Sequence, residues 1–89
     1  APIIDFSQPL KIYPNPTSNS STIEMLITES GKLNIEVYNI NGQLVANPMN
    51  EYHEEGIWLG EIGAELPSGF YFVRASINQQ VHTLKFIKE

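Results

Sequence analysis

The chain of 89 residues contains no cysteine. Disulfide bonds, thiolate metal sites and cysteine nucleophiles are therefore excluded. No apolar run approaches the ~18 residues that a membrane-spanning helix needs, and no signal peptide is visible, so we expect no membrane insertion. The chain begins with Ala1-Pro2 rather than methionine. We therefore expect a segment of a longer protein whose targeting signal lies elsewhere.

Basic residues are scarce. Five lysines and arginines stand against ten aspartates and glutamates, which gives a formal net charge of -5 and a pI of about 4.9. Nucleic acids and anionic membrane surfaces attract basic patches, so neither is an expected partner. Apolar residues make up 42% of the chain and charged residues 17%. This composition favours a folded domain over disorder, and the length fits one domain with a modest core.

A sustained helical pattern is also absent, and apolar residues alternate with polar ones as they do in strands. The alternation is clearest over residues 22–28, 32–40 and 70–77, and two further strand-like runs cover 56–62 and 80–88. The side chains that alternation places together on one face of their run are Ile23, Met25 and Ile27, then Leu33, Ile35 and Val37, then Tyr71, Val73, Ala75 and Ile77.

Turn signals separate these runs. Asn41-Gly42 predicts a hairpin with a type I′ turn, and Asn78-Gln79 is a weaker hairpin signal. Residues 64–69 predict a loop, and residues 46–55 are expected to form the longest irregular connection. The spacing predicts an all-β fold, an immunoglobulin-like β-sandwich of about seven short antiparallel strands over residues 10–89. Residues 1–9 are expected to be a leader or the remnant of a linker.

No arrangement of residues in the sequence indicates catalysis. His53 and His82 lie far apart and lack a metal-ligand spacing, and no serine sits in a G-x-S-x-G turn. Glu51, Glu54 and Glu55 gather near two asparagines, but their spacing fits a solvated acidic loop better than a calcium loop. We predict no catalytic residue, no metal site and no cofactor.

Two surface motifs leave alternatives open. Trp58 and Tyr52 would offer a sugar-stacking platform if Ile57 and Leu59 point inward and Trp58 points out. Asn19 begins an N-glycosylation sequon, a motif that is common by chance. A carbohydrate-binding or adhesion module, or a structural spacer of an extracellular enzyme, therefore remains an alternative function.

Three stretches in order resemble a known family. They are "YPNP" at residues 13–16, "IEVYNINGQLV" at 35–45 and "LPSGFYFVR" at 66–74, and a terminal strand "HTLKFIKE" follows. Together they resemble the type A C-terminal sorting domain of the type IX (Por) secretion system of Bacteroidota. The positions that carry the resemblance are Tyr13, Pro14, Asn15, Pro16, Tyr38, Asn39, Gly42, Leu66, Pro67, Gly69, Tyr71 and Arg74.

The resemblance implies a secretion and sorting signal, not an enzyme. In such proteins the cargo passes through the periplasm, and outer-membrane components of the machinery read the domain. A sortase-like cysteine peptidase commonly removes the domain and attaches the cargo to the cell surface. The cargo then lies at the surface or outside the cell. If this pattern holds, cleavage would fall at or before residues 1–9.

The terminal strand is the segment where we expect the machinery to read the domain. Its apolar residues lie on both faces, with Leu84 and Phe86 on one and Val81 and Ile87 on the other. An edge strand with unpaired backbone groups invites a partner strand. The predicted recognition residues are Leu84, Lys85, Phe86, Ile87 and Lys88. We expect a monomer, although a free edge also leaves pairing between two copies open.

The prolines near the start are interpreted as a corner. Pro14 stands where a first strand ends, a position that needs no backbone N–H. Asn15 is expected to cap its own turn through its side chain, and Tyr13 to anchor the edge of the core.

Overall fold

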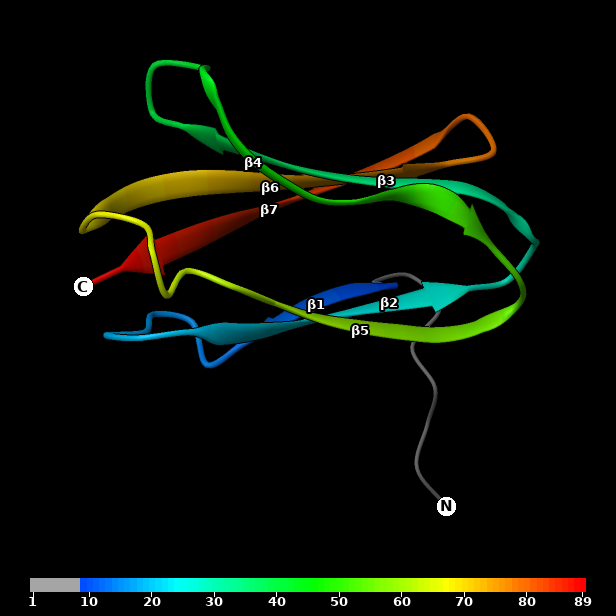
Figure 1. Ribbon diagram of the computed structural model, residues 1–89, viewed down its shortest axis with the longest axis horizontal. Helices are drawn as coiled ribbons and strands as arrows, with labels where there is room; N and C mark the ends of the chain where they lie inside the picture. Colours follow the sequence, from blue (N-terminus) through cyan, green and yellow to red (C-terminus); the bar gives the residue numbers. More distant parts are fainter. Residues whose placement is uncertain (1–8) are drawn as a thin grey trace.

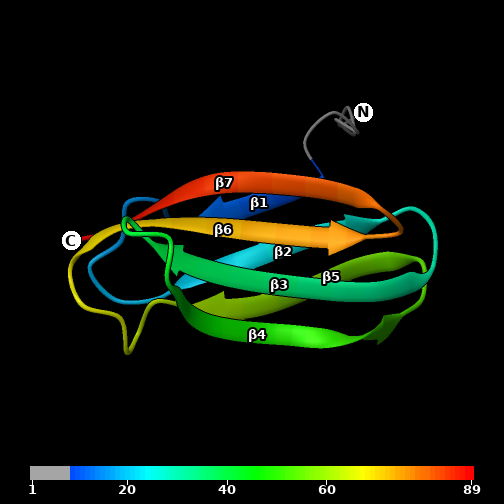
Figure 2. The ribbon, with the colours of Figure 1, turned by 90° about the horizontal axis from the view of Figure 1, so that it is seen from above.

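The chain folds into two stacked antiparallel sheets. A computed structural model describes residues 9–89, so of the expected leader only Pro9 falls within it. One sheet has the order β1-β2-β5 and the other β4-β3-β6-β7. Figure 1 shows the two layers edge-on, and Figure 2 shows the four-stranded sheet lying over the three-stranded one. The strands are β1 (Leu10–Tyr13), β2 (Ser21–Ile27), β3 (Gly31–Asn39), β4 (Leu44–His53), β5 (Gly56–Ile62), β6 (Gly69–Ile77) and β7 (Gln80–Lys88).

This architecture confirms the predicted all-β sandwich of seven strands. Hairpins join β1 to β2, β3 to β4 and β6 to β7, and the other connections cross between the sheets. Crossing connections of this kind are typical of Greek-key sandwiches, the immunoglobulin fold among them.

Alternating side chains build the core, as the sequence predicts. Every second residue of β2, β3 and β6 is buried between the sheets, because successive side chains of a strand point to opposite faces. The ten residues that alternation groups on one face of these three strands are all buried. Leu10, Ile12, Ile62 and Phe86 complete the core.

The type I′ geometry predicted for Asn41-Gly42 occurs instead in the other hairpin turn. Asn78 and Gln79 both have positive φ, 49° and 69°, so the β6–β7 hairpin is the one with type I′ character. Between β3 and β4 only Gly42 has positive φ, at 81°. There Asn39 N donates to Gln43 O at 2.9 Å, which closes a longer loop. The predicted hairpin is confirmed, but its predicted type I′ turn is wrong.

The predicted irregular connection at residues 46–55 is also wrong. Most of this stretch belongs to β4, which pairs with β3 through register shifts near Val37. Bulges disrupt the alternation on which sequence reasoning depends. Pro48 is compatible with the strand because β4 lies at the edge of its sheet, where a missing N–H need not break a ladder.

Candidate functional site

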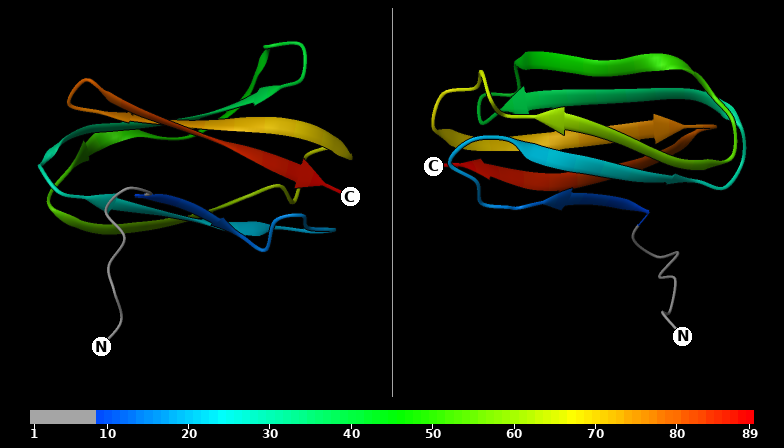
Figure 3. Two further views of the ribbon diagram at one scale, coloured as in Figure 1. Left: turned by 180° about the vertical axis from the view of Figure 1, so that it is seen from behind. Right: turned by 60° about the horizontal axis from the view of Figure 1, so that its bottom comes forward.

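The proline-rich corner covers the end of the terminal strand. β1 and β7 lie at the same side of the sandwich, each at the edge of its sheet (Figure 3). After β1 the chain passes over β7, where Asn15 Nδ2 donates to Lys85 O at 2.7 Å. Ile87 N donates to Asn15 Oδ1 at 3.0 Å. One asparagine side chain therefore makes the two bonds that a neighbouring strand would make.

Thr17 continues this pairing with backbone groups. Its N–H donates to Ile87 O at 3.1 Å, and Glu89 N donates to Thr17 O at 2.8 Å. Thr17 and Lys88 form a parallel bridge. Ser21 Oγ, at the start of β2, donates to Pro14 O and so ties the corner to β2. The edge of β7 from Lys85 O to Glu89 N is thus already paired within the domain.

These contacts correct two expectations for the corner. The prediction that Asn15 caps its own turn is wrong, because both polar atoms of its side chain bind β7. Tyr13 does not anchor the core edge: it is 45% exposed, and its hydroxyl donates to Glu24 Oε1 at 3.1 Å. This hydrogen bond to the carboxylate is the main reason that the pKa of Tyr13 is raised above 10.0.

The predicted recognition residues divide between the two faces of β7. Phe86 is fully buried in the core, and Leu84 packs against it. Lys85 is exposed and Ile87 is half-buried, on the opposite face. Lys88, also among the predicted recognition residues, is buried, with only 8% of it exposed. Its ammonium group donates to Asn19 O at 2.7 Å and to Gly63 O.

The stretch Leu66–Arg74 fixes the start of β6. The Tyr71 side chain is buried, and its hydroxyl donates to Pro67 O at 2.6 Å. Such a bond from a strand tyrosine to the backbone a few residues upstream resembles the tyrosine corner of immunoglobulin-like domains. Leu66 N donates to Gly63 O at 3.1 Å, and the Leu66 side chain packs on the core. These motif residues, with Gly69 at the start of the strand, hold the fold together.

Asn39 holds the β3–β4 hairpin in the same way. Its Oδ1 accepts hydrogen bonds from Asn41 N and Gln43 N, each at 3.0 Å. Gly42 N donates to Asn39 O at 3.0 Å. The asparagine side chain satisfies the loop backbone, and glycine supplies the positive φ. The motif pair Asn39 and Gly42 is therefore explained by the geometry of the turn.

The outer face of the four-stranded sheet carries an exposed aromatic patch. We define this outer patch as Tyr38, Leu44, Phe70, Phe72, Lys85 and Ile87. In the register of the sheet, Phe72 lies between Tyr38 and Lys85, and Leu44 is beyond Tyr38. Phe70 lies beside Ile87, and Lys85 Nζ is 4.7 Å from the centre of the Phe70 ring. Phe70 is 48% exposed and Phe72 41%.

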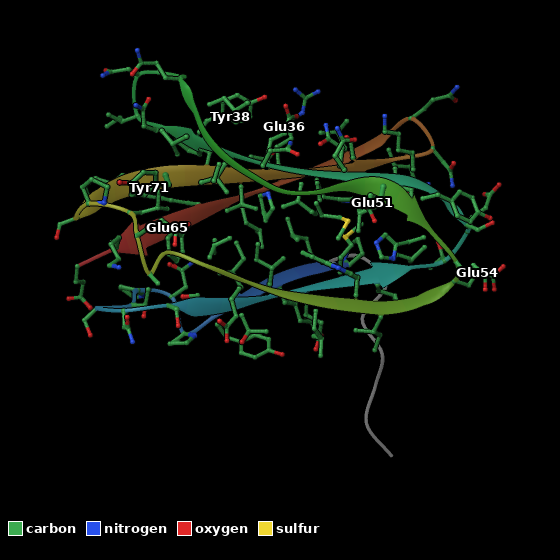
Figure 4. All side chains as sticks on the ribbon, in the orientation of Figure 1. Glu36, Tyr38, Glu51, Glu54, Glu65 and Tyr71 are labelled. Atoms are coloured by element: carbon green, nitrogen blue, oxygen red, sulfur yellow. The ribbon has the colours of Figure 1, made fainter. Side chains whose placement is uncertain are left out.

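A charged row borders the outer patch. Arg74 lies directly opposite Glu36 in the register, on the same face as Tyr38. Figure 4 shows Glu36 and Tyr38 on the outer side of the four-stranded sheet. The hydrogen bond with Glu36 raises the pKa of Tyr38, and Arg74 opposes that effect in part. Three of the five basic residues of the chain, Lys32, Arg74 and Lys85, lie on this face.

Alternation alone placed Phe70, Phe72 and Arg74 on one face, but sequence reasoning did not assign them a role. Leu44 was missed as well, because the bulged β4 obscured which way its side chains point. Two exposed aromatics on one face of a strand were the available signal, since exposed apolar clusters often mark contact surfaces.

The sugar-stacking arrangement is not formed. Ile57 and Leu59 are 63% and 58% exposed, so the condition that they point inward is wrong. Trp58 packs against the core instead, with its ring edge toward His53 at a centroid distance of 6.5 Å. Tyr52 is exposed, opposite Lys32 on the outer face of the other sheet. The two aromatic rings therefore face different directions.

The acidic residues Glu51, Glu54 and Glu55 lie on β4 and in the turn that follows it, where Figure 4 places Glu54. Within residues 9–89 no group of three or more histidine, cysteine, aspartate or glutamate side chains is arranged to hold a metal ion. The same part of the chain contains no helix long and apolar enough to cross a membrane.

Comparison with protein families decides the assignment. A family model described as secretion system C-terminal sorting domain matches residues 11–89. The chain belongs to this family of sorting domains. A search of curated proteins gave no match. The sorting domain is a C-terminal signal for type IX secretion, and it marks a protein exported to the cell surface or the extracellular space.

Proposed function

We propose that components of the type IX machinery at the outer membrane recognise this sorting domain in its folded state, through the outer patch. The observation that carries the proposal is the division of the terminal strand. Phe86 and Lys88 are buried, and the backbone from Lys85 O onward is paired with the corner. A receptor that meets the folded domain can contact this strand through Lys85 and Ile87, which belong to the outer patch.

The composition of the outer patch indicates the partner. Aromatic residues and arginine are enriched in the centres of protein interfaces, and here Phe70 and Phe72 lie next to Arg74 and Lys85. The chain as a whole carries a net charge of -5, so this face is a basic island on an acidic molecule. An acidic surface with apolar gaps is its natural complement.

Site-specific photo-crosslinking in exporting cells tests the proposal. A photoreactive phenylalanine analogue replaces Phe72 in one version of the cargo and Leu59 in another. Both positions are exposed, but they lie on opposite outer faces. We expect a crosslink to an outer-membrane protein from position 72 and none from position 59. Equal crosslinking from both positions, or crosslinking from position 59 alone, would contradict it.

We further propose that the cargo crosses the periplasm and that a sortase-like peptidase then removes the domain ahead of Pro9. The pairing of the described residues supports this position. Leu26 N donates to Pro9 O at 2.9 Å, and β1 pairs with β2 from Leu10 onward. A peptidase that binds extended chain would have to unfold the sandwich to cut later. Mass spectrometry of the exported cargo gives its C-terminus, and an end inside residues 10–89 would refute this step.

The domain acts in this proposal as an address and a substrate, not as an enzyme. Its family membership supports that role. The alternative of a carbohydrate-binding module depended on Trp58 and Tyr52, which do not form a common platform. The alternative of a structural spacer predicts that a cargo without the domain is exported normally. Deleting residues 10–89 from the full cargo and measuring its export separates the spacer from the signal.

A further inference from the structure

We propose that the first half of β7, from Val81 to Lys85, is a separate docking edge for an extended strand of a partner protein. One side chain of that strand would enter a pocket beside His82. This surface shares Lys85 with the outer patch but is otherwise distinct from it, because it uses the backbone edge of β7 and the space between the sheets. The partner is a peptide segment in β conformation with a small hydroxyl or apolar residue and a carboxylate at defined positions.

The first argument is the state of the backbone edge. Lys85 O and Ile87 N point away from β6, toward Asn15. Because a strand repeats every two residues, the N–H and C=O groups of Val81 and Thr83 point to the same side. Within residues 9–89 these groups have no backbone partner, whereas Ile87 and Glu89 have theirs. The corner covers the last part of the edge and leaves the first part available.

The second argument is a pocket directly inside this edge. It has a volume of about 80 Å³. Because a cavity of roughly 150 Å³ holds benzene, this one suits a side chain of a few carbon atoms. Its walls come from both sheets, with Pro9, Met25, Ile77, Gln80 and His82 among the lining residues.

The third argument is an unpaired polar atom on a residue that lines that pocket. His82 Nε2 is buried and has no hydrogen-bond partner among the described residues. Buried polar atoms are nearly always paired, because leaving one unpaired costs about 1–3 kcal/mol. The hydroxyl of a threonine or serine that enters the pocket can supply the missing bond once the imidazole ring turns Nε2 toward it.

Strand geometry turns these features into a recognition pattern. In an added strand, the residue opposite His82 points inward to the pocket, and those opposite Thr83 and Lys85 point outward. An acidic residue opposite Lys85 faces its ammonium group, and the position opposite Leu84 must be small because β1 lies beneath. From its N-terminal end, an antiparallel partner therefore has an acidic residue opposite Lys85 and a small residue opposite Leu84. Any residue can follow opposite Thr83, and a small apolar or hydroxyl residue then lies opposite His82.

The same features favour a partner protein over a second copy of this chain. Antiparallel pairing of two β7 strands about Thr83 would place Lys85 against Val81, with no carboxylate opposite the lysine. Two chains of net charge -5 also repel each other. Lys85 is the one charged residue between Val81 and Lys85, so an acidic residue in the partner selects this edge.

Nuclear magnetic resonance with a synthetic peptide tests the proposal. The probe is the blocked peptide acetyl-TEATTT-amide, which places a threonine opposite His82, with the lysine-for-glutamate peptide as its control. Before addition, the amides of Val81, Thr83 and Lys85 should exchange quickly with solvent and those of Ile87 and Glu89 slowly. Addition of the probe should shift and protect the first three amides. We expect the lysine peptide to bind about ten-fold more weakly, a difference of about 1.4 kcal/mol.

Two variants separate edge pairing from other modes of binding. Thr83→Pro removes an N–H that β6 does not use, so circular dichroism should show an intact sandwich. It should weaken probe binding about ten-fold or more by the loss of one edge hydrogen bond, whereas Thr83→Ala should bind like the parent chain. The proposal is overturned if the three amides are already protected in the free chain, or if the probe leaves them unchanged. It is also overturned if Thr83→Pro binds normally, or if sedimentation shows a dimer paired through β7.

Discussion

Lys88 occupies an unusual position for a lysine, because its ammonium group is buried at the end of the sandwich. It donates to the carbonyl oxygens of Asn19 and Gly63, and so joins the β1–β2 loop, the start of the β5–β6 connection and β7. Lysine is almost never buried without partners. The residue therefore contributes to the stability of the domain rather than to a surface that a receptor can touch.

Replacing Lys88 by methionine should lower the free energy of unfolding by about 1–3 kcal/mol. The side chain keeps its length, but two buried carbonyls lose their donor. Lys85→Met is the matched control on the same strand, and because Lys85 is exposed its effect should stay within about 0.5 kcal/mol. Urea denaturation measures both variants. Equal effects would show that the buried contacts of Lys88 do not stabilise the fold.

Gly63 meets two requirements at once. Its φ is +103°, and an added Cβ would lie 2.9 Å from Phe86 Cζ and 3.2 Å from Asn19 O. We expect Gly63→Ala to destabilise the domain by about 3 kcal/mol, from backbone strain plus overpacking. Gly42→Ala is the control, because Gly42 has φ +81° and open space around it, and should cost about 1 kcal/mol. If thermal denaturation shows the same loss of stability for both variants, the close approach of Phe86 to Gly63 does not add to the cost of the substitution.

At the scale of elements, the corner after β1 and the end of β7 form one unit although about 70 residues of sequence separate them. The sequence predicted a corner and a terminal edge strand, and both exist. It did not predict that the corner covers the end of β7, because a single asparagine side chain that pairs with a strand edge leaves no periodic pattern in the sequence.

Alternation grouped the buried side chains of β2, β3 and β6 correctly, since each of these strands has one buried face. It failed at β4, where bulges shift the register.

Asn15→Ala tests this unit. It removes both hydrogen bonds to β7, so the unfolding free energy should fall by about 1–2 kcal/mol. The amide of Ile87 should also exchange with solvent much faster than in the parent chain. Asn41→Ala serves as the control, since Asn41 is another exposed turn asparagine whose side chain makes no hydrogen bond in the described part of the chain. Unchanged protection of Ile87 would show that Asn15 does not cover the edge.

Removing residues 85–89 should unfold the domain rather than erase a linear signal. The deletion takes away Phe86, a fully buried core side chain, and the backbone partners of Thr17. Loss of such a residue costs about 3–5 kcal/mol, a large share of the stability of a small domain. Circular dichroism should therefore show loss of the cooperative transition. A truncated domain that stays folded would instead leave the terminal residues available as a linear address.

In the whole molecule, the residues that build the sandwich are distinct from those that we propose the machinery contacts. The motif positions Asn15, Asn39, Pro67 and Tyr71 are explained by hydrogen bonds within the fold. The side chains left at the surface of the four-stranded sheet form the outer patch, with Arg74 beside it. Under the proposed function, the folded domain that presents this face is the address of the exported cargo.

The most direct test of this claim is the export of a cargo protein that carries the double variant Arg74→Glu, Lys85→Glu, measured by fractionating cells and medium. Both residues are exposed on the outer face of the four-stranded sheet, so circular dichroism should confirm that the domain still folds. Lys11→Glu, an exposed lysine on the outer face of the other sheet, is the control. The account predicts that the double variant is retained inside the cell and that the control is exported normally. Normal export of a folded double variant would contradict recognition through this face.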